Sequence, residues 1–192
     1  MENILLVVNS DKAKENIVQM LKSNASYKIS VSRNCCEASR ALVDNIFDLV
    51  IINTPLPDEF GSELALNITE STSCGVLLIV KNDLVDEISQ IVENAGVFVI
   101  GKPISKAMFF QTLKLVSAFH NRISNLKNEN DVLKNKIQEI KLVDRAKCIL
   151  IEYLNMSENE AHKYIEKQAM NNRLTKVEIA KDILKTYDSK VN

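Results

Sequence analysis

Five short apolar runs, each as long as a buried strand, recur through the first hundred residues of this 192-residue chain. Segments with helical periodicity separate them, at residues 12–21, 36–43, 62–69 and 84–94. Nearly continuous apolar character is typical of strands buried on both faces of a parallel sheet. The alternation predicts an α/β fold with a five-stranded, doubly wound parallel sheet, whose functional loops follow the carboxyl ends of the strands. The runs are Ile4–Val8, Tyr27–Val31, Leu49–Ile52, Val76–Val80 and Val97–Ile100.

A long helix is expected after the last strand, because no Gly or Pro follows Pro103 and Ser105 is a suitable N-cap. Its apolar residues fall into a heptad repeat, which indicates a coiled coil and a homodimer. Asn130 favours a parallel pair, since two such amides can bond across the dimer axis. The alternatives are an antiparallel pair, or a stripe that packs on the chain's own sheet. The a positions are Val116, Ile123, Asn130 and Ile137, and the d positions are Phe119, Leu126, Leu133 and Ile140.

Two further helices are predicted near the C-terminus. Ser157 with Glu160 and Thr175 with Glu178 match the capping box, in which a hydroxyl and a carboxylate satisfy the free amides of the first turn. Apolar stripes on both helices, with Ile149, Leu150 and Tyr153 before them, predict a three-helix module. The expected organisation is an α/β domain over 1–115, a coiled-coil helix over 116–142 and an all-α domain over 143–192.

Composition excludes several classes of protein. No apolar run reaches the roughly 18 residues of a membrane span, and the start MENILLVVNSDK has no features of a signal peptide, so we expect a cytoplasmic protein without a membrane partner. Two distant His residues, no Gly-rich phosphate loop and no paired carboxylates argue against an enzyme. The four cysteines lack CxxC spacing and neighbouring His residues, which favours reduced thiols over zinc or redox sites, and no cofactor is expected. They are Cys35, Cys36, Cys74 and Cys148.

Charge is distributed unevenly along the chain. Residues 1–115 carry 10 basic and 14 acidic side chains, whereas residues 116–192 carry 14 basic and 11 acidic ones. The second half is therefore the better candidate for binding an anionic partner, although its excess of three positive charges is small.

The segment DLVIINTPLPDEFG (Asp48–Gly61), together with GKP (Gly101–Pro103), resembles the response-regulator receiver family. In that family an aspartate at the end of the third strand accepts phosphate, acids after the first strand bind magnesium, and a hydroxyl residue ends the fourth strand. Here amides and apolar residues stand at these positions, with Val80 or Lys81 in place of the hydroxyl residue. An amide is not a nucleophile towards phosphate, and Mg²⁺ requires anionic oxygen ligands. The resemblance therefore implies a pseudo-receiver with a degenerate pocket at Val8, Asn9, Asn53, Val80 and Lys102.

The segments RAK (Arg145–Lys147) and SENEAHKYIEKQAMNNRLTKVEIAKDIL (Ser157–Leu184) resemble the ANTAR module of bacterial transcription antitermination regulators. The order of the three parts is also similar to that of amide- and nitrate-type antiterminators. The resemblance implies binding of hairpin loops in a leader RNA, where side chains read unstacked bases and cations hold phosphates. The candidate RNA-binding residues are Lys147, His162, Lys163, Lys167, Met170, Arg173 and Lys176.

Three functions remain open at this point. The first is a dimeric RNA-binding antiterminator whose pseudo-receiver responds to a regulatory protein partner or a small molecule instead of phosphate. The second is a DNA-binding regulator, because capped helices joined through Asn171-Asn172 suggest a helix-turn-helix. The third is an adaptor that binds only protein. Each lysine also fits a solvated helix face, and Tyr164 and Tyr187 are more typical of a core than of base stacking.

Overall fold

The computed structural model describes residues 3–23 and 27–188. The chain divides between Leu126 and Lys127 into two compact units, which are considered separately below. Within the described residues, no helix is both long enough and apolar enough to cross a membrane.

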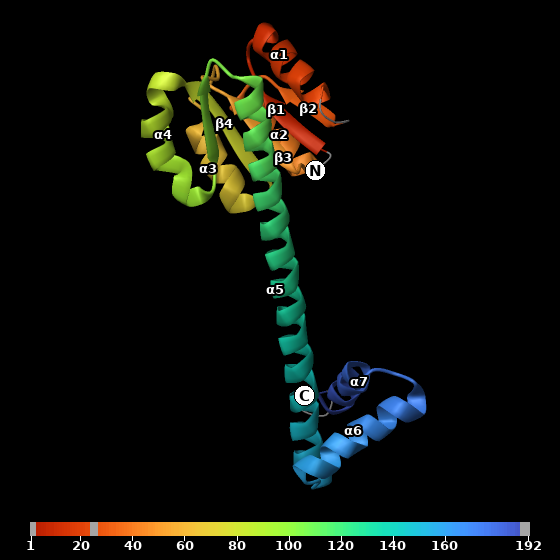
Figure 1. Ribbon diagram of the computed structural model, residues 1–192. Helices are drawn as coiled ribbons and strands as arrows, with labels where there is room; N and C mark the ends of the chain where they lie inside the picture. The colour runs from red at the N-terminus through yellow and green to blue at the C-terminus, as the bar shows by residue number, and fades with distance from the viewer. Residues whose placement is uncertain (1–2, 24–26, 189–192) are drawn as a thin grey trace. The chain divides into compact units, whose positions relative to one another are not determined.

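The first unit contains a five-stranded parallel sheet, as the alternation of apolar runs predicts (Figure 1). The strand order is β2-β1-β3-β4-β5, so the winding direction reverses between β1 and β3. In open sheets of this kind, ligands bind at the carboxyl ends of the strands beside such a reversal. The strands are β1 (Asn3–Val7), β2 (Lys28–Ser32), β3 (Leu49–Asn53), β4 (Gly75–Lys81) and β5 (Phe98–Lys102).

Four helices connect the strands, as predicted. The one marked difference concerns the fourth, where the α-helical part is only eight residues long and a 3₁₀ turn flanks it on each side, at Asn82–Leu84 and Glu93–Ala95. The hydroxyl of Ser10 accepts from the amide of Ala13, so Ser10 is the N-cap of the first helix. The helices are α1 (Asp11–Lys22), α2 (Cys35–Asp44), α3 (Ser62–Ser71) and α4 (Val85–Val92).

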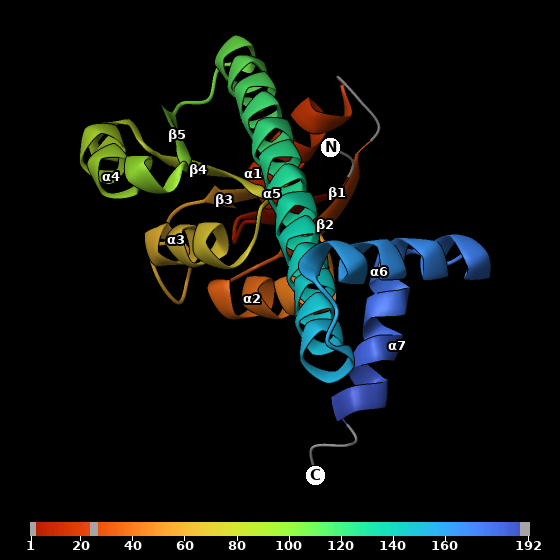
Figure 2. The same ribbon diagram turned by 90° about the horizontal axis from the view of Figure 1, so that it is seen from below.

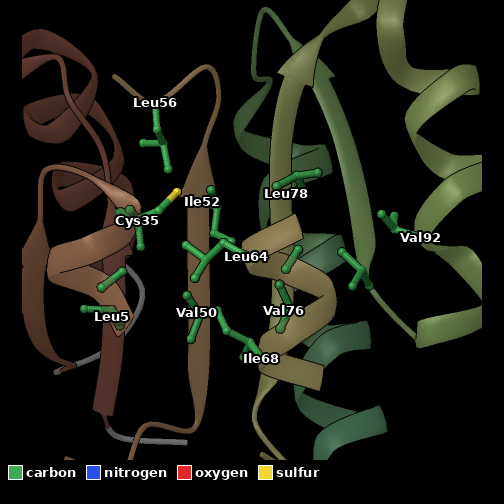
Figure 3. Packing of buried hydrophobic residues seen from close by; sticks show 14 of the residues in the cluster. Leu5, Cys35, Val50, Ile52, Leu56, Leu64, Ile68, Val76, Leu78 and Val92 are labelled. Atoms are coloured by element: carbon green, nitrogen blue, oxygen red, sulfur yellow. The ribbon is translucent and has the colours of Figure 1, made fainter. Parts of the chain in front are cut away.

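Both faces of the sheet are buried, which explains why the strands read as continuous apolar runs. Leu5, Val50 and Ile52 point to one face and pack with α2, α3 and α4. Figure 3 shows Leu64 and Ile68 of α3 beside the strand residues Val50, Ile52 and Val76. The alternate strand residues point to the other face and pack against α1 and the start of the next helix. Side chains from neighbouring strands thus form two cores, one on each side of the sheet.

The long helix α5 (Lys106–Leu154) runs for 49 residues without a break. The Ser105 hydroxyl accepts from the amide of Met108 at 3.2 Å, which confirms the predicted N-cap. Phe109, Leu113 and Val116 of its first turns are buried against the sheet. A Cβ atom at Gly75 would lie only 2.4 Å from Val116 Cγ1, so Val116 packs tightly over the start of β4. The heptad position assigned to Val116 therefore serves the chain's own core, as in the alternative prediction.

The second unit joins the last turns of α5 to α6 (Glu158–Asn172) and α7 (Lys176–Asp188), as Figure 2 shows. Ala146 and Leu150 of α5 share a core with Ala161, Ile165 and Ala180. Both predicted capping boxes are present: Glu160 and Glu178 each accept from the N-cap amide at 2.8 Å and donate their own amide to the N-cap hydroxyl. The three-helix module is therefore confirmed.

Candidate functional site

A cleft of about 680 Å³ opens at the carboxyl ends of the strands, between α1 and the start of α5. The loop after β1, the end of β3 and the loop after β5 all contribute to its wall, through Asn9, Asn53 and Lys102 among others. This is the place that the reversal of winding between β1 and β3 predicts for a ligand site.

The structure brings together three of the five residues predicted for the degenerate pocket. Asn9, Asn53 and Lys102 line the cleft. Val8 and Val80 do not, because their side chains are buried in the cores on opposite faces of the sheet. Thr54 is buried and donates its hydroxyl to the carbonyl of Ile79 at 3.1 Å, so this hydroxyl ties the end of β3 to β4.

Lys102 is the most unusual group in the cleft. Its ammonium donates to the backbone carbonyl of Thr54. Burial lowers the pKa of Lys102, and the nearby positive charge of Lys81 lowers it further. No Asp or Glu lies among the described residues that line the cleft, so a carboxylate does not offset this charge there.

The acids of the loop after β3 are used as helix caps. The carboxylate oxygens of Asp58 accept from the amides of Cys35 and Cys36, at 3.0 Å each. Glu59 accepts from the amide of Leu64 at 3.0 Å. The hydrogen bond from the Cys35 amide contributes most to lowering the pKa of Asp58. Two acids that follow the sequence position of a phosphate acceptor therefore stabilise the first turns of α2 and α3.

Receiver domains bind a Mg²⁺ ion, but the residues that line this cleft are not suitable ligands for Mg²⁺. The cleft offers amide oxygens and a lysine, whereas Mg²⁺ needs one or more carboxylates to compete with its hydration. Within residues 3–23 and 27–188, no three His, Cys, Asp or Glu side chains lie close enough to hold a metal ion together. We therefore assign no step to a metal.

The seven predicted RNA-binding residues fall into two groups in the second unit. Lys163, Lys167 and Met170 are exposed and, at spacings of four and three residues, share one face of α6. Met170 is 80% exposed, which is unusual for an apolar side chain of this size. Arg173 follows at the end of α6 in a left-handed conformation with φ of 55°. These four residues are called the α6 stripe below.

The other three residues are paired with acids. Lys147 contacts Asp144 at 2.7 Å and Glu158 at 3.4 Å, and only 16% of its side chain is exposed. Lys176 and His162 both contact Glu166, at 2.5 Å and 3.2 Å. The pKa of Glu166 is lowered, chiefly by its hydrogen bond with Lys176. The three basic residues line a hollow of about 300 Å³ and link α5, α6 and α7, so they are less available to phosphates than the α6 stripe.

The two tyrosines considered for base stacking belong to the core. Tyr164 and Tyr187 are partly buried against the helical cluster. The ring of Tyr187 lies 5.3 Å from that of Tyr153, centroid to centroid. This agrees with the structural interpretation of both residues.

An apolar stripe continues along α5 beyond the residues that pack on the sheet. Its side chains are between 37% and 60% exposed, although they would be expected in a core. Phe119, at its start, also contacts Phe98 with ring centroids 5.8 Å apart. Asn130 is exposed in the middle of the stripe. The exposed members are Ile123, Leu126, Leu133, Ile137 and Ile140.

Several known proteins resemble this chain in sequence. The ANTAR domain family matches residues 131–184. The chain is 26% identical to the transcriptional regulatory protein PdtaR of Mycobacterium tuberculosis, over 72% of this chain and 68% of the relative. It is 25% identical to the aliphatic amidase regulator of Pseudomonas aeruginosa, over 74% and 70%. A shorter match, 34% identical, covers 38% of the chain and 19% of the nitrate regulatory protein of Klebsiella oxytoca.

Solved structures resemble the first unit. The receiver domain of an HD domain-containing protein from Pseudomonas fluorescens superposes with a TM-score of 0.59 and 21% identity, over 65% of this chain and 92% of that domain. A receiver domain protein from Methanospirillum hungatei gives 0.57 and 19%, over 64% and 98%. At this identity the likeness shows the fold alone. The first unit thus has the fold of receiver domains, and residues 131–184 match the ANTAR domain family.

We predict that acetyl phosphate with Mg²⁺ leaves the intact mass of the protein unchanged, because the cleft has neither a carboxylate nucleophile nor acidic metal ligands. The Asn53→Asp variant should behave in the same way, since Val8 and Asn9 still supply no acid. A receiver with its full set of acids is the positive control for intact-mass spectrometry. One phosphate adduct at residue 53 in either protein would contradict the prediction.

We also predict that Asp58→Ala lowers the urea midpoint of unfolding at pH 7, because the amides of Cys35 and Cys36 lose their acceptor. The folded pKa of Asp58 lies below its ordinary value of 3.8. This stabilisation is therefore fully present above the unfolded pKa and is lost as the pH falls through the folded one. The gap between wild type and variant should close in acid. Glu70→Ala, at an exposed position on α3, is the control, and a gap that persists at the lowest pH would refute the assignment.

Proposed function

We propose that this chain, in which an ANTAR domain follows a receiver fold, is a cytoplasmic RNA-binding regulator of transcription antitermination that acts as a homodimer without phosphorylation. The ANTAR match and the related regulators support an RNA-binding antitermination regulator. Family and fold point to a regulatory protein rather than an enzyme. The observation that carries the proposal to particular residues is the α6 stripe, in which cations flank an exposed methionine.

The chemistry of the α6 stripe suits a single-stranded RNA loop. Lys163, Lys167 and Arg173 can hold phosphates as the chain of the loop passes along α6. Met170 offers a flexible, polarisable side chain against the face of an unstacked base. Neither lysine forms an ion pair with a described residue, so binding to phosphate breaks no existing contact. A duplex offers no such splayed bases, which favours hairpin loops over duplex DNA.

The exposed apolar stripe of α5 supports dimerisation. Ile123, Leu126, Leu133, Ile137 and Ile140 keep the heptad spacing and remain at least 37% exposed in the single chain. Pairing two such helices removes these side chains from water, and each half-exposed side chain then contributes about half of the roughly 1.5–3 kcal/mol of full burial. The seam begins after Val116, because Val116 is already buried on the sheet.

Control by a protein partner or a small molecule follows from the composition of the cleft. A receiver fold that cannot hold Mg²⁺ or accept phosphate retains the cleft and the loops around it. Contacts with these loops can still favour one conformation over another, provided that the partner binds the two conformations with different affinities.

The function is tested by fluorescence anisotropy with three probes: a leader RNA with two adjacent small hairpins, a duplex DNA of the same length, and an unstructured RNA. We expect the first to bind most tightly, with an affinity that falls as salt rises because phosphates are contacted. Equal affinity for all three probes would mean that binding is nonspecific charge attraction and would contradict the proposed function. Tighter binding to duplex DNA would favour the DNA-binding alternative, and binding to none would favour an adaptor.

We predict that Arg173→Gly separates folding from RNA binding. Glycine accepts the left-handed conformation at φ of 55° without strain, so the free energy of unfolding should stay the same or rise by about 0.5–1 kcal/mol. Loss of the guanidinium should weaken RNA binding about tenfold and reduce the slope of log affinity against log salt concentration by about 1. Lys181→Gly, at an exposed site on α7 outside the α6 stripe, is the control for lost charge. Unchanged RNA affinity in the Arg173 variant would remove this residue from the interface.

We predict that Asn130→Leu changes the oligomeric state or the register of the coiled coil, because the paired amides no longer select a parallel dimer. RNA affinity should fall with it if two ANTAR domains act together. Asn128→Leu is the matched control, since heptad position f faces away from the seam. Sedimentation that shows the same dimer for the Asn130 variant, with RNA binding intact, would rule out this role.

A further inference from the structure

The cleft beside α1 contains positive charge without an acidic counterpart. Lys102 and Lys106 both line it, and none of its described lining residues is Asp or Glu. Lys81 adds a third positive charge close to Lys102. Burial of an ammonium group without an anion is unfavourable, and the carbonyl of Thr54 only partly compensates for the lost water. An anion in the cleft would relieve this imbalance.

An unused amide lies beside the lysine. Asn53 is 7% exposed and lines the cleft, and no hydrogen bond joins its side chain to another residue that the structure describes. Its amide atoms are not among the buried atoms that lack a partner, so they are accessible to a ligand in the cleft. Asn9 and Asn16 bring two more amide groups to the same cleft. The cleft therefore offers several donors to one group that can accept more than one hydrogen bond.

Part of the cleft wall is apolar. Ile17 and Met20 of α1 and Ile104 after β5 belong to this apolar wall, together with the methyl group of Ala13. The cleft volume of about 680 Å³ lies within the range of sites for small organic molecules. A purely inorganic anion would leave this wall without a partner, whereas an organic anion would use both sides.

We propose that the cleft binds a small organic carboxylate. The carboxylate lies at Lys102 and accepts from the Asn53 amide, and the carbon body packs against Ile17, Met20 and Ile104. Binding itself depends only on the cleft. The further idea that the bound carboxylate is the signal that regulates RNA binding rests on the proposed function.

The test uses the full chain with labelled Ile and Met methyl groups, observed by NMR. Benzoate, benzamide and benzylamine serve as probes, because they share one ring and are anionic, neutral and cationic at neutral pH. Benzoate should shift the methyl signals of Ile17, Met20 and Ile104 with a dissociation constant on the order of 1 mM, as expected for so few atoms. The methyls of Ile165 and Met170, in the second unit, should not move. The amide and the amine should bind at least about tenfold more weakly.

Variants of the cleft sharpen the test. Lys102→Gln should weaken benzoate about tenfold or more and leave benzamide unchanged, because only the charged contact is lost. Lys12→Gln, which removes an exposed charge from α1 outside the cleft, should change neither. Ala13→Leu fills the cleft from α1 and should abolish benzoate binding while the other methyl signals stay in place, so the site can be tested even where Lys102→Gln fails to fold.

Three outcomes would overturn the proposal: equal shifts with all three probes, unchanged benzoate affinity in the Lys102 variant, or no shift of the three cleft methyls. Tighter binding of inorganic phosphate than of benzoate would also overturn it, since the apolar wall would then have no role. The measurement contains no RNA. If the protein binds benzoate but no RNA hairpin, the proposed function is wrong and the ligand site stands. If it binds the hairpin but not benzoate, the ligand site is wrong and the proposed function stands.

Discussion

Burial of the sheet on both faces is the constraint on which the rest of the first unit depends. Once α2, α3 and α4 cover one face and α1 and the start of α5 cover the other, the inner strands β1, β3 and β4 must be apolar on both sides. Polar side chains of these strands are then restricted to the strand ends, where Asn53 lies, and Lys102 lies at the end of β5. The cleft thus follows from the sheet, and the same packing removes Val8 and Val80 from it.

Periodicity was sufficient to predict the order and nature of the elements, because period-two and period-3.6 patterns reflect burial directly. The caps at Ser105, Ser157 and Thr175 were readable for a similar reason, since they involve residues close in sequence. Long-range geometry was not readable. The sequence does not reveal that Val116 packs over Gly75, or that Asp58 caps a helix 22 residues earlier in the chain. For the proposed RNA-binding surface, the family resemblance suggested seven positions, and the structure separates Lys147, His162 and Lys176 from the α6 stripe because these three are paired with acids.

The positions of the charged side chains distinguish the two halves of the chain more clearly than their net charges do. In the second unit, Glu158 and Glu166 hold three basic residues in the helical framework, whereas the cations of the α6 stripe stay exposed. In the first unit, acids lie at helix starts and the cleft keeps its lysines. Each half therefore presents cations to a different site, although the whole chain has a net charge of only −1.

The use of Asp58 and Glu59 as helix caps bears on any attempt to build a phosphate-accepting pocket into this fold. Such a pocket would require new acids after β1 and at the end of β3, because the existing acids of this loop already support α2 and α3. An aspartate at position 53 alone would have no acidic metal ligands beside it, and acids at positions 8 and 9 alone would have no acceptor to activate. At least two replacements would therefore have to be made together.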